Sequence, residues 1–473
     1  MQAHSQNAQR TKEAYDVTVI GGGVVGCAVL RALACAGLSA CLLEKGGDIL
    51  SGASKGNSAI LHTAFDAPVG SLEWQCMQAG YQEYLQIHEA LNLPLLKTGA
   101  LLIAWSDEEA QKLPDILHKA HQNRVTDVAP VPLEQLHAQE PHLAAHAKAA
   151  LHVPGEYLID PWSAPLAYTL QAIAHGAEVM RRAEVLSGER VDGHWHLQTS
   201  QGMVRTRLVV NCAGNYGDLV EAICRPSPFA ITPRKGQFVV YDKTASRLAS
   251  HILLPVPNDR TKGVVITRTI FGNLLVGPTA EDQQDRTTAA IDEAALQSLH
   301  QAGVRMLPAL AQEPVTATYA GLRPASQFKD YQIEALPTEH WITVGGIRST
   351  GLTASLGIGQ HVLGLVNQHF QATGETRPTH WPHMPVLSDY HPRDFQCKGS
   401  GPLVCHCESV TRREIEAALE GPLPAGDLGG LKRRTRAGMG RCQGFYCQAN
   451  VVEMATQAGL RVDGIDAMPG GNA

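Results

Sequence analysis

The sequence lacks a long apolar run, a strong excess of either charge, and any internal repeat or low-complexity segment. Without an apolar stretch of about 18 residues, no transmembrane helix is expected. A formal net charge of -6 gives no reason to expect a nucleic-acid partner. What remains is a chain of 473 residues with 44% hydrophobic content, enough for a soluble globular protein of two or three domains.

Most of the cysteines show no pairing pattern. The apolar run 17–30, which follows Arg10 and Lys12, imitates a signal peptide, but glycines at 21, 22, 23 and 26 interrupt it. We therefore expect a cytoplasmic protein in which most of the seven isolated cysteines are small core residues. These are Cys27, Cys35, Cys41, Cys76, Cys212, Cys224 and Cys397.

A glycine-rich turn follows the first predicted strand. Residues 17–20 form a β-branched strand that runs into G-G-G-V-V-G and an Ala/Leu-rich helix. Gly21 permits a tight turn, Gly23 lets the backbone approach a pyrophosphate, and Gly26 lets the helix pack on the strand. A second strand ends at Glu44, where a carboxylate can accept ribose hydroxyls. The pattern predicts dinucleotide binding, and a purely structural glycine turn is the alternative.

The segment after the second strand favours FAD over NAD. A nicotinamide-only domain would continue to alternate strands and helices, but a Gly/Ser-rich loop follows, with hydroxyl and amide groups suited to pyrophosphate and flavin edges. The cofactor-binding candidates in this part of the chain are Lys45, Ser51, Asn57 and Ser58. The loop ends at His62, which can act as a general base; a structural histidine is the competing interpretation.

Three segments resemble the D-amino-acid-oxidase-like flavoprotein superfamily. Residues 57–62 are similar to the N-S-G-x-I-H stretch of L-2-hydroxyglutarate dehydrogenases and its counterpart in glycerol-3-phosphate dehydrogenases, with Ala59 where Gly is common. Residues 208–214 resemble the family's V-V-N-x-A-G strand. Residues 341–353 resemble a family segment that consists of a strand, a glycine turn and the start of a helix, whose backbone amides face the flavin ring. The resemblance implies an FAD site that includes Ala213, Gly214, Gly346, Gly351, Leu352 and Thr353.

Four cysteines near the C-terminus can form a metal-binding site. They occur as C-H-C and, after a helical stretch, as C-Q-G-F-Y-C, so two short loops can bring four thiolates together. Two irons bridged by sulfide fit such a site, while zinc and disulfides remain alternatives. The cysteines are Cys405, Cys407, Cys442 and Cys447.

The residues around these cysteines favour the iron-sulfur cluster over zinc and disulfides. The sequences C-H-C-E-S-V-T-R-R-E-I and T-R-A-G-M-G-R-C-Q-G-F-Y-C resemble the small [2Fe-2S] domain of the bacterioferritin-associated-ferredoxin type, which also forms the C-terminal part of anaerobic glycerol-3-phosphate dehydrogenases. Thr411 with Glu414 predicts a capping box, and Asp427 can cap the next helix. Basic residues crowd the approach to the third cysteine, where positive charge would offset a thiolate cluster. They are Lys432, Arg433, Arg434, Arg436 and Arg441.

These segments predict an α/β chain with a Rossmann-like FAD-binding domain, an inserted α+β substrate domain and a small C-terminal iron-sulfur domain. The FAD-binding domain is expected to be discontinuous and to comprise residues 14–60, 150–222 and 330–372. Residues 61–149 and 223–329 form the predicted substrate domain. The proline-rich segment 373–402 is predicted to be a linker, and 403–473 the [2Fe-2S]-binding domain.

Candidate substrate residues lie on segments that contain glycine. Arg323 lies in a G-x-R-P segment like that of the family and is the first choice for gripping a carboxylate or phosphate; a structural salt bridge is the alternative. Arg348 follows the last strand and is a second anchor or a domain-interface bridge. Lys235-Gly236-Gln237 matches the superfamily's P-x-[KR]-G-Q turn near the flavin. The histidine of the hydroxyglutarate enzymes' H-x-T-R segment corresponds to Val265, which argues against that substrate.

Together these features predict an FAD-dependent dehydrogenase that oxidises a small anionic 2-hydroxy acid or glycerol 3-phosphate. His62, Arg323 and Arg348 are the predicted catalytic residues. Electrons would pass from the flavin to the [2Fe-2S] cluster and on to a partner protein or a quinone, in a hetero-oligomer or at the inner membrane through a partner. The alternatives are an amine or imino-acid dehydrogenase of the opine or proline type, and a non-catalytic electron-transfer subunit.

Overall fold

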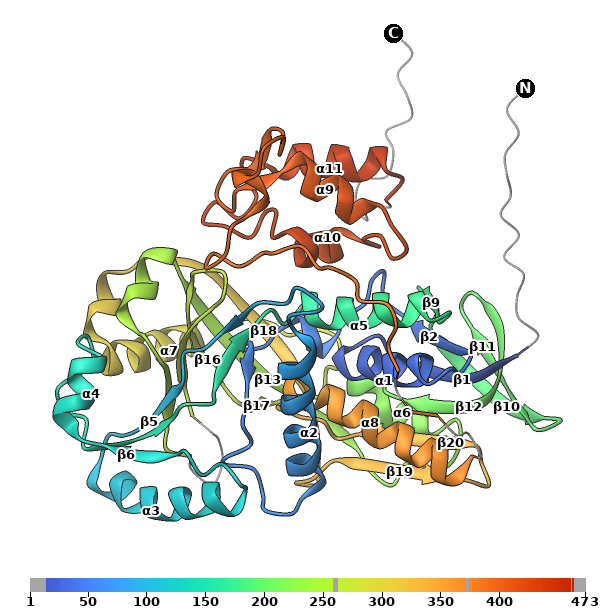
Figure 1. Ribbon diagram of the computed structural model, residues 1–473, viewed down its shortest axis with the longest axis horizontal. Helices are drawn as coiled ribbons and strands as arrows, with labels where there is room; N and C mark the ends of the chain where they lie inside the picture. Colours follow the sequence, from blue (N-terminus) through green and yellow to red (C-terminus); the bar gives the residue numbers. More distant parts are fainter. Residues whose placement is uncertain (1–13, 258–262, 371–373, 376, 461, 463–473) are drawn as a thin grey trace, which may run out of the picture.

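Two large β-sheets lie side by side, and a small helical module sits above them (Figure 1). The computed structural model describes residues 14–257, 263–370, 374–375, 377–460 and 462; the segment with Arg10 and Lys12 lies outside these residues. No helix in the described part of the chain is both long and apolar enough to span a bilayer. The arrangement is the predicted α/β fold with an inserted second domain and a C-terminal module.

The first sheet is built around parallel strands that carry the N-terminal glycine turn. Its order is β10-β11-β12-β1-β2-β9, with β20 pairing to β12 and β19 to β20. β1 lies parallel to both β2 and β12. β1, β2 and the C-terminal half of β12 are almost fully buried because helices cover the sheet. The strands are β1 (Tyr15–Ile20), β2 (Ala40–Glu44), β9 (Glu178–Arg181), β10 (Val185–Val191), β11 (His194–Thr199), β12 (Gly202–Asn211), β19 (Gln332–Leu336) and β20 (Trp341–Gly345).

The second sheet forms the wall opposite the glycine turn. Its order is β17-β13-β16-β15-β14-β5-β7-β6, and the long strand β18 pairs antiparallel with β13. The strands are β5 (Ala100–Ala104), β6 (Ala129–Val131), β7 (Ala149–Val153), β13 (Ile231–Tyr241), β14 (Ile252–Pro255), β15 (Val265–Arg268), β16 (Leu274–Gly277), β17 (Glu281–Asp282) and β18 (Val315–Ser326). A separate small sheet is formed by β3 (Ile60–Leu61), β8 (Tyr157–Ile159) and β4 (Leu95–Leu96).

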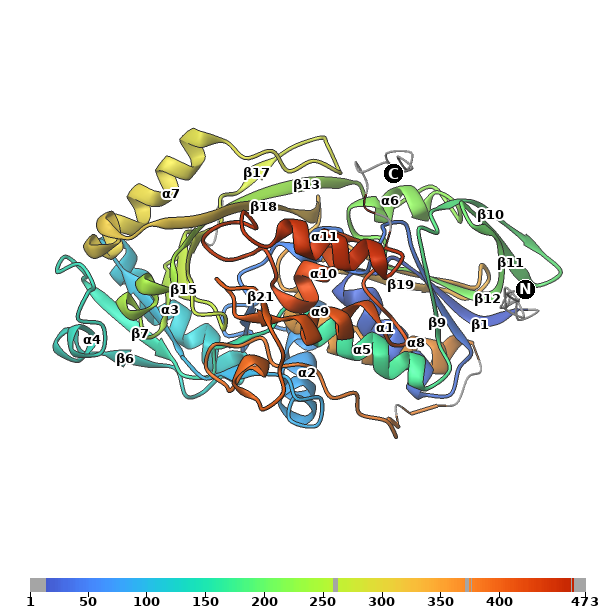
Figure 2. The same ribbon diagram turned by 90° about the horizontal axis from the view of Figure 1, so that it is seen from above.

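Helices cover both sheets, and side-chain caps fix several of their starts. Ser71 accepts from the Trp74 N–H at the start of α2, and Asp292 accepts from the Ala295 N–H at the start of α7. The helices of the two large domains are α1 (Val24–Cys35), α2 (Leu72–Ile87), α3 (Asp107–Gln122), α4 (Leu133–Gln139), α5 (Ser163–Ala174), α6 (Gly217–Glu221), α7 (Glu293–Met306) and α8 (Gly351–His369). Figure 2 places α7 and α3 over the second sheet and α1, α5 and α8 beside the first.

The structure divides the chain somewhat differently from the sequence-based boundaries. Helix α2 lies in the segment 61–149 that was assigned to the substrate domain, but it packs on α8 of the first domain. A Cβ on Gly357 would collide with the Cys76 carbonyl, so the two helices are in backbone contact. Strand β7 belongs to the second sheet through its pairing with β5, so the return to the first sheet comes after residue 153 rather than at 150.

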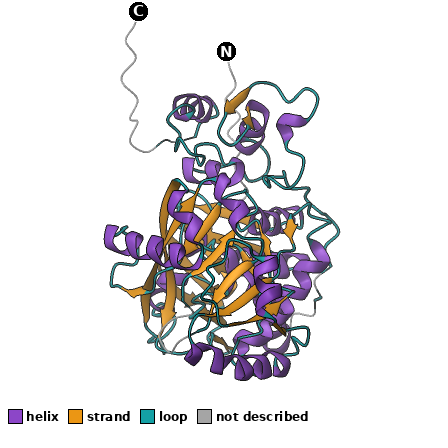
Figure 3. Ribbon diagram, turned by 90° about the vertical axis from the view of Figure 1, so that its left-hand side faces the viewer, coloured by secondary structure: helices purple, strands orange, loops and turns teal. Residues whose placement is uncertain are grey.

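The C-terminal module is mainly helical and has a core of its own (Figure 3). It contains the short hairpin β21 (Leu403–Cys405) and β22 (Val410–Thr411) and the helices α9 (Arg412–Leu419), α10 (Leu428–Thr435) and α11 (Gln448–Gln457). Thr411 and Glu414 form the predicted capping box, and Asp427 accepts from the Gly430 N–H at the start of α10. The predicted linker is packed against the larger domains: Leu387 is buried, and Asp389 accepts from Lys243 at 2.6 Å.

Candidate functional site

The turn after β1 is shaped by two glycines that tolerate no side chain. Gly21 has φ +109°, and a Cβ there would lie 2.5 Å from the Cys212 carbonyl oxygen. A Cβ on Gly26 would collide with the Gly21 carbonyl, so this residue lets α1 pack on the strand, as predicted from the sequence. The N–H of Val24, in the first turn of α1, donates to the Ser54 hydroxyl at 2.9 Å. The helix N-terminus therefore faces the loop and favours an anion there.

Glu44 ends β2 beside this turn. Its carboxylate accepts from the Gly22 N–H at 2.8 Å and the Gly46 N–H at 2.6 Å. Burial raises the pKa of Glu44, although both N–H groups oppose the shift. The ammonium of the next residue, Lys45, lies 3.1 Å from the centre of the Tyr216 ring. A buried acceptor at the end of the second strand is the arrangement that a ribose requires.

A cavity of about 1010 Å³ extends from this turn to the second sheet. Its wall contains segments from both sheets and from the loop between β2 and β3. The predicted residues that line it are Gly21, Gly23, Glu44, Lys45, Ser51, Asn57, Ser58, His62, Ala213, Gly214, Arg323, Gly346, Arg348, Gly351 and Leu352. Gly26 and Thr353 do not line it: the first packs under the turn, and the second accepts from the His62 N–H through its hydroxyl at 3.0 Å.

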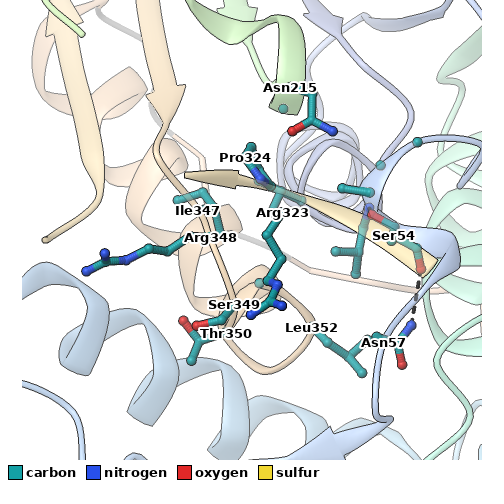
Figure 4. Close-up of a pocket in the computed structure, with 18 of the residues that line it drawn as sticks. Ser54, Asn57, Asn215, Arg323, Pro324, Ile347, Arg348, Ser349, Thr350 and Leu352 are labelled. Carbon is teal, nitrogen blue, oxygen red and sulfur yellow. Dashed lines mark hydrogen bonds between the residues drawn. The ribbon is translucent and has the colours of Figure 1, made fainter. Parts of the chain in front are cut away.

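The loop at the cavity edge is held by its own polar groups. Asn57 donates from Nδ2 to the Ser54 carbonyl at 3.2 Å (Figure 4) and accepts from the Ala59 N–H at 2.8 Å. Tyr319 of β18 donates to the Asn57 carbonyl at 2.6 Å, which ties the loop to the second sheet. Ala59 has φ +60°, so the residue that departs from the family pattern occupies a backbone region that favours glycine.

Arg323 extends into the cavity from β18 without a carboxylate partner (Figure 4). Its Nη2 donates to the Thr279 carbonyl at 2.5 Å, and no ion pair to it occurs among the described residues. Burial lowers its pKa to about 10, the nearby Arg234 adds to this, and Asp282 opposes it. Asp282 itself is held by Arg234 at 2.6 and 3.1 Å. The guanidinium is therefore still a cation at neutral pH and is available to an anion in the cavity.

Arg348 does not join Arg323. In Figure 4 its guanidinium points away from Arg323 and Leu352, and it donates to the Lys329 carbonyl at 2.6 Å. It lines the cavity, but its guanidinium is turned away from Arg323 toward Lys329. The reason is its place in the turn after β20, where the chain leaves the sheet before α8 begins.

His62 forms a pair with a glutamate that the sequence did not single out. Its Nδ1 lies 2.7 Å from Glu156 Oε2, and Glu156 is fully buried. The other carboxylate oxygen accepts from the N–H and the hydroxyl of Thr63, at 2.6 and 2.8 Å. His62 lines the cavity, and no hydrogen bond to its Nε2 occurs among the described residues, so Nε2 is the ring nitrogen left for a ligand.

The second sheet supplies a mostly apolar wall. Phe238, Leu254 and Val265 line the cavity, so an apolar side chain stands where the hydroxyglutarate enzymes have a histidine. Lys235, Gly236 and Gln237 lie within the long strand β13 rather than on the predicted turn. Gln237 is buried and donates to Glu281 at 2.9 Å, and Lys235 pairs with the same carboxylate at 3.1 Å, so these two side chains support β17 instead of facing a ligand.

The four C-terminal cysteines interact with one another. Cys405 and Cys447 are buried, and burial, together with a hydrogen bond between their side chains, raises the pKa of Cys447 to about 11. The pKa of Cys442 is lowered by backbone N–H groups of Tyr446, Gly444 and Phe445 that point at its sulfur. The N–H of Cys442 in turn donates to Cys407, and that of Gly438 to Cys447.

These N–H donors suit sulfur atoms that bear negative charge, as the thiolate ligands of an iron-sulfur cluster do. Among the described residues there is no group of three His, Cys, Asp or Glu side chains close enough for a single metal ion. In a cluster of two irons and two bridging sulfides each iron takes two cysteine sulfurs, and the four sulfurs surround a wider site than that of a single zinc ion, so the four cysteines fit the cluster better than they fit zinc.

The basic residues before Cys442 bind the larger domains. Arg434 forms a buried ion pair with Asp48, in which Nη2 lies 3.0 Å from Oδ1. Arg433 donates to the Ile49 carbonyl at 3.0 Å, and Arg441 pairs with Asp242. The predicted role of charge compensation at the cluster is therefore replaced, for these three residues, by contacts that dock the module.

Arg436 makes a further contact between the module and the large domains. It pairs with Glu408 at 2.8 Å, and its guanidinium lies 4.0 Å from the centre of the Phe271 ring. Phe271 stacks on Trp162 with ring centres 5.5 Å apart, and the Trp162 indole donates to the Lys55 carbonyl at 3.2 Å. Lys55 lines the cavity, so packed groups connect the cysteine loop with the cavity wall.

The fold, the cavity and the cysteine module together define a flavoprotein with an attached iron-sulfur module. Residues 16–365 match the model of the FAD dependent oxidoreductases, and residues 403–456 match the BFD-like [2Fe-2S] binding domain. Because the first match covers well over half of the 473 residues, the chain belongs to the FAD dependent oxidoreductase family. It carries binding domains for both FAD and a [2Fe-2S] cluster, as predicted.

Three relatives place the chain within this family. It is 30% identical to a glycerol 3-phosphate dehydrogenase of Caloramator mitchellensis over 462 residues, which cover 96% of each chain. It is 28% identical to an L-2-hydroxyglutarate dehydrogenase of Indibacter alkaliphilus, over 56% of this chain and 68% of the relative. The FAD-bound L-α-glycerophosphate oxidase of Mycoplasma pneumoniae superposes with a TM-score of 0.74 at 26% identity, covering 80% of this chain and all of that one.

Proposed function

We propose that this chain is a dehydrogenase that oxidises glycerol 3-phosphate and delivers the electrons through its [2Fe-2S] cluster to an acceptor. The observation that carries the proposal is Arg323, a cation without a carboxylate partner inside the cavity. The end-to-end match with a glycerol 3-phosphate dehydrogenase supports it, because that match extends over nearly the whole chain. A small 2-hydroxy acid presents the same pair of groups, a hydroxyl and an anion, and is the second candidate for the substrate.

The proposed roles follow from where each side chain lies. Arg323 binds the phosphate or carboxylate and so fixes the distance from the anion to the reacting carbon. His62 accepts the proton of the substrate hydroxyl at Nε2. The residues for FAD are Gly21 and Gly23 of the glycine turn, Glu44 and the loop Ser51 to Ser58, which all line the cavity. FAD held by these residues would supply a hydride acceptor for the C–H bond of the carbon that bears the substrate hydroxyl, and the alcohol would thereby become a carbonyl.

The route from the cavity to the cluster is proposed to follow the packed side chains between them. Lys55, Trp162, Phe271 and Arg436 form an unbroken series of contacts that ends one residue from the ligand Cys407, at Glu408. Electron transfer through a protein depends on such contacts because gaps between atoms weaken electronic coupling. We assign these side chains as the medium between the two redox centres.

The acceptor is proposed to approach the opposite side of the cluster. Phe445 and Tyr446, in the loop between two of the cysteines, are 82% and 75% exposed, although both are large aromatic residues. Their backbone N–H groups donate to the Cys442 sulfur, so the exposed rings are close to the cluster ligands. A partner protein or a quinone that covers these rings would receive one electron at a time, in a hetero-oligomer or at the inner membrane.

The test is an anaerobic purification followed by a titration with substrates. Flavin absorbance with two irons and two sulfides per chain is expected, and glycerol 3-phosphate should bleach the flavin and then reduce the cluster. Absence of both cofactors would refute the proposal. Bleaching by L-2-hydroxyglutarate, proline or an opine in place of glycerol 3-phosphate would reassign the substrate. If none of these compounds bleaches the flavin, the chain is better described as an electron-transfer subunit.

A further inference from the structure

Glu156 is a buried carboxylate next to the proposed base and has no role in the function described above. We infer that Glu156 is a positioning residue that keeps the proton of neutral His62 on Nδ1, so that Nε2 is the nitrogen that accepts the proton of the substrate. The inference rests on the proposed function, because it concerns the base of that reaction.

The hydrogen bonds at Glu156 determine the state of the imidazole. Oε1 accepts from the Thr63 N–H at 2.6 Å and from the Thr63 hydroxyl at 2.8 Å. Oε2 lies 2.7 Å from Nδ1 of His62 and has no described partner apart from this ring. A carboxylate only accepts hydrogen bonds, so Nδ1 must be the protonated nitrogen, and the lone pair of neutral His62 is then on Nε2.

The position of the ring is fixed as well as its proton. The backbone N–H of His62 donates to the Thr353 hydroxyl at 3.0 Å, and Thr353 belongs to the first turn of α8. Glu156 lies just before β8, which pairs with β3 at Ile60 and Leu61. Helix α8 and the strands β3 and β8 of the small sheet therefore hold the imidazole at the cavity wall, and the substrate hydroxyl meets a base of constant orientation.

A second histidine-glutamate pair in the same chain provides a matched control. His251 Nδ1 also lies 2.7 Å from a carboxylate oxygen, that of Glu140, and Glu140 is as buried as Glu156. Glu140 accepts from the backbone N–H groups of Ser250 and His251 as well, at 2.7 to 3.0 Å. Neither Glu140 nor His251 lines the cavity. The chemistry of the two pairs is the same, and only one of them faces the substrate.

Glu156→Gln is the informative substitution because the amide cannot satisfy both neighbours. The Thr63 N–H can only donate, so it holds the amide oxygen and turns the NH₂ group toward His62. Nδ1 must then accept, and the ring proton moves to Nε2, where it blocks proton uptake. We expect the rate constant for flavin reduction by glycerol 3-phosphate to fall by about 10²- to 10⁴-fold, the range for loss of a general base, with FAD content and substrate affinity unchanged.

A double-mutant cycle separates positioning from a general structural effect. In a His62→Ala background the Glu156→Gln substitution should cause no further loss, because the carboxylate acts only through the imidazole. Glu140→Gln should leave the flavin-reduction rate unchanged. Losses from His62→Ala and Glu156→Gln that multiply, an equal loss in Glu140→Gln, or a wild-type rate in Glu156→Gln would each overturn the inference.

The outcome is distinguishable from failure of the proposed function. If glycerol 3-phosphate does not bleach the wild-type flavin, the proposed substrate is wrong, and the same cycle is run with the compound that does bleach it. If Glu156→Gln fails to retain FAD, Glu156→Asp replaces it, since its shorter side chain withdraws the carboxylate from the ring. The rate must then fall when His62 is present and not in the His62→Ala background; an unchanged rate with His62 present overturns the inference.

Discussion

Replacing Arg323 with methionine should make the protein more stable and at the same time a poorer enzyme. Burial lowers the pKa of Arg323 from the ordinary 12.5 to about 10. Because one pKa unit corresponds to about 1.4 kcal/mol, holding this cation in the cavity wall costs about 3 kcal/mol. Water in the open cavity screens part of that cost, and the Thr279 carbonyl loses its donor in the variant, which costs about 1 kcal/mol. We expect a net gain of about 1 to 2 kcal/mol in the free energy of unfolding.

The effect on binding has the opposite sign. A hydrogen bond to a charged group contributes about 1.5 to 3 kcal/mol, so the dissociation constant for glycerol 3-phosphate should rise about 10- to 150-fold. Thermal denaturation of the holoenzyme with and without substrate measures both quantities. Without substrate Tm should rise by about 1 to 2 °C, and the upward shift produced by substrate should shrink.

Arg234→Met is the control, because Arg234 also faces the cavity but already pairs with Asp282. A half-exposed pair of this kind contributes about 0 to 1 kcal/mol, so its loss should not stabilise the protein. If Arg323→Met is less stable than the wild type and binds substrate with unchanged affinity, Arg323 is a structural residue, and the argument for an anionic substrate fails with it.

Other expectations concern the link between the two redox centres. Asp48→Asn leaves Arg434 buried without its partner and should weaken docking of the module by about 3 kcal/mol or more, seen as faster hydrogen exchange in α10; unchanged exchange would contradict this. Burial raises the pKa of Asp48, but Arg434 outweighs it and holds the pKa below 3.8, so the stabilisation is complete above that pH and is lost only as the pH falls through the lowered value. Trp162→Leu should slow reduction of the cluster in stopped-flow experiments and leave flavin reduction unchanged; equal rates for wild type and variant would remove Trp162 from the route. Cys442→Ala should abolish bound iron and sulfide while FAD stays bound, and a variant with full iron content would exclude this cysteine as a ligand.

The sequence predicted the parts of the site that depend on local backbone. The glycine turn, Glu44 and the loop from Ser51 to Ser58 all lie at the cavity because a strand, a tight turn and a helix place them there whatever the rest of the chain does. The capping box at Thr411 is local in the same way.

Contacts between residues that are far apart in the sequence could not be predicted from local sequence patterns. Glu156 meets His62 across 94 positions, and nothing near it in the sequence marks it as the partner of a histidine. The arginines before Cys442 were assigned to the cluster because it is near in sequence, whereas Arg434 pairs with Asp48 across 386 positions. Arg348 is similar: it lines the cavity, as its neighbours in the turn suggested, but its guanidinium donates to the Lys329 carbonyl. The pattern of charged and apolar residues along the chain predicts helices and strands, but it does not indicate which residues pair when they are far apart in the sequence.

The loop between β2 and Ser51 contacts both the cavity and the cysteine module, and this double contact affects what happens when oxygen damages the enzyme. One side faces the cavity through Gly46 and Ser51, while Asp48 and Ile49 bind the cysteine module on the other. Either contact orders the loop and so lowers the cost of forming the other. FAD binding should therefore strengthen docking of the module, and docking should strengthen FAD binding by the same factor. An enzyme that loses its cluster to oxidation would then also release its flavin more readily. Damage would yield an inactive apoprotein instead of a reduced flavin that passes electrons to oxygen.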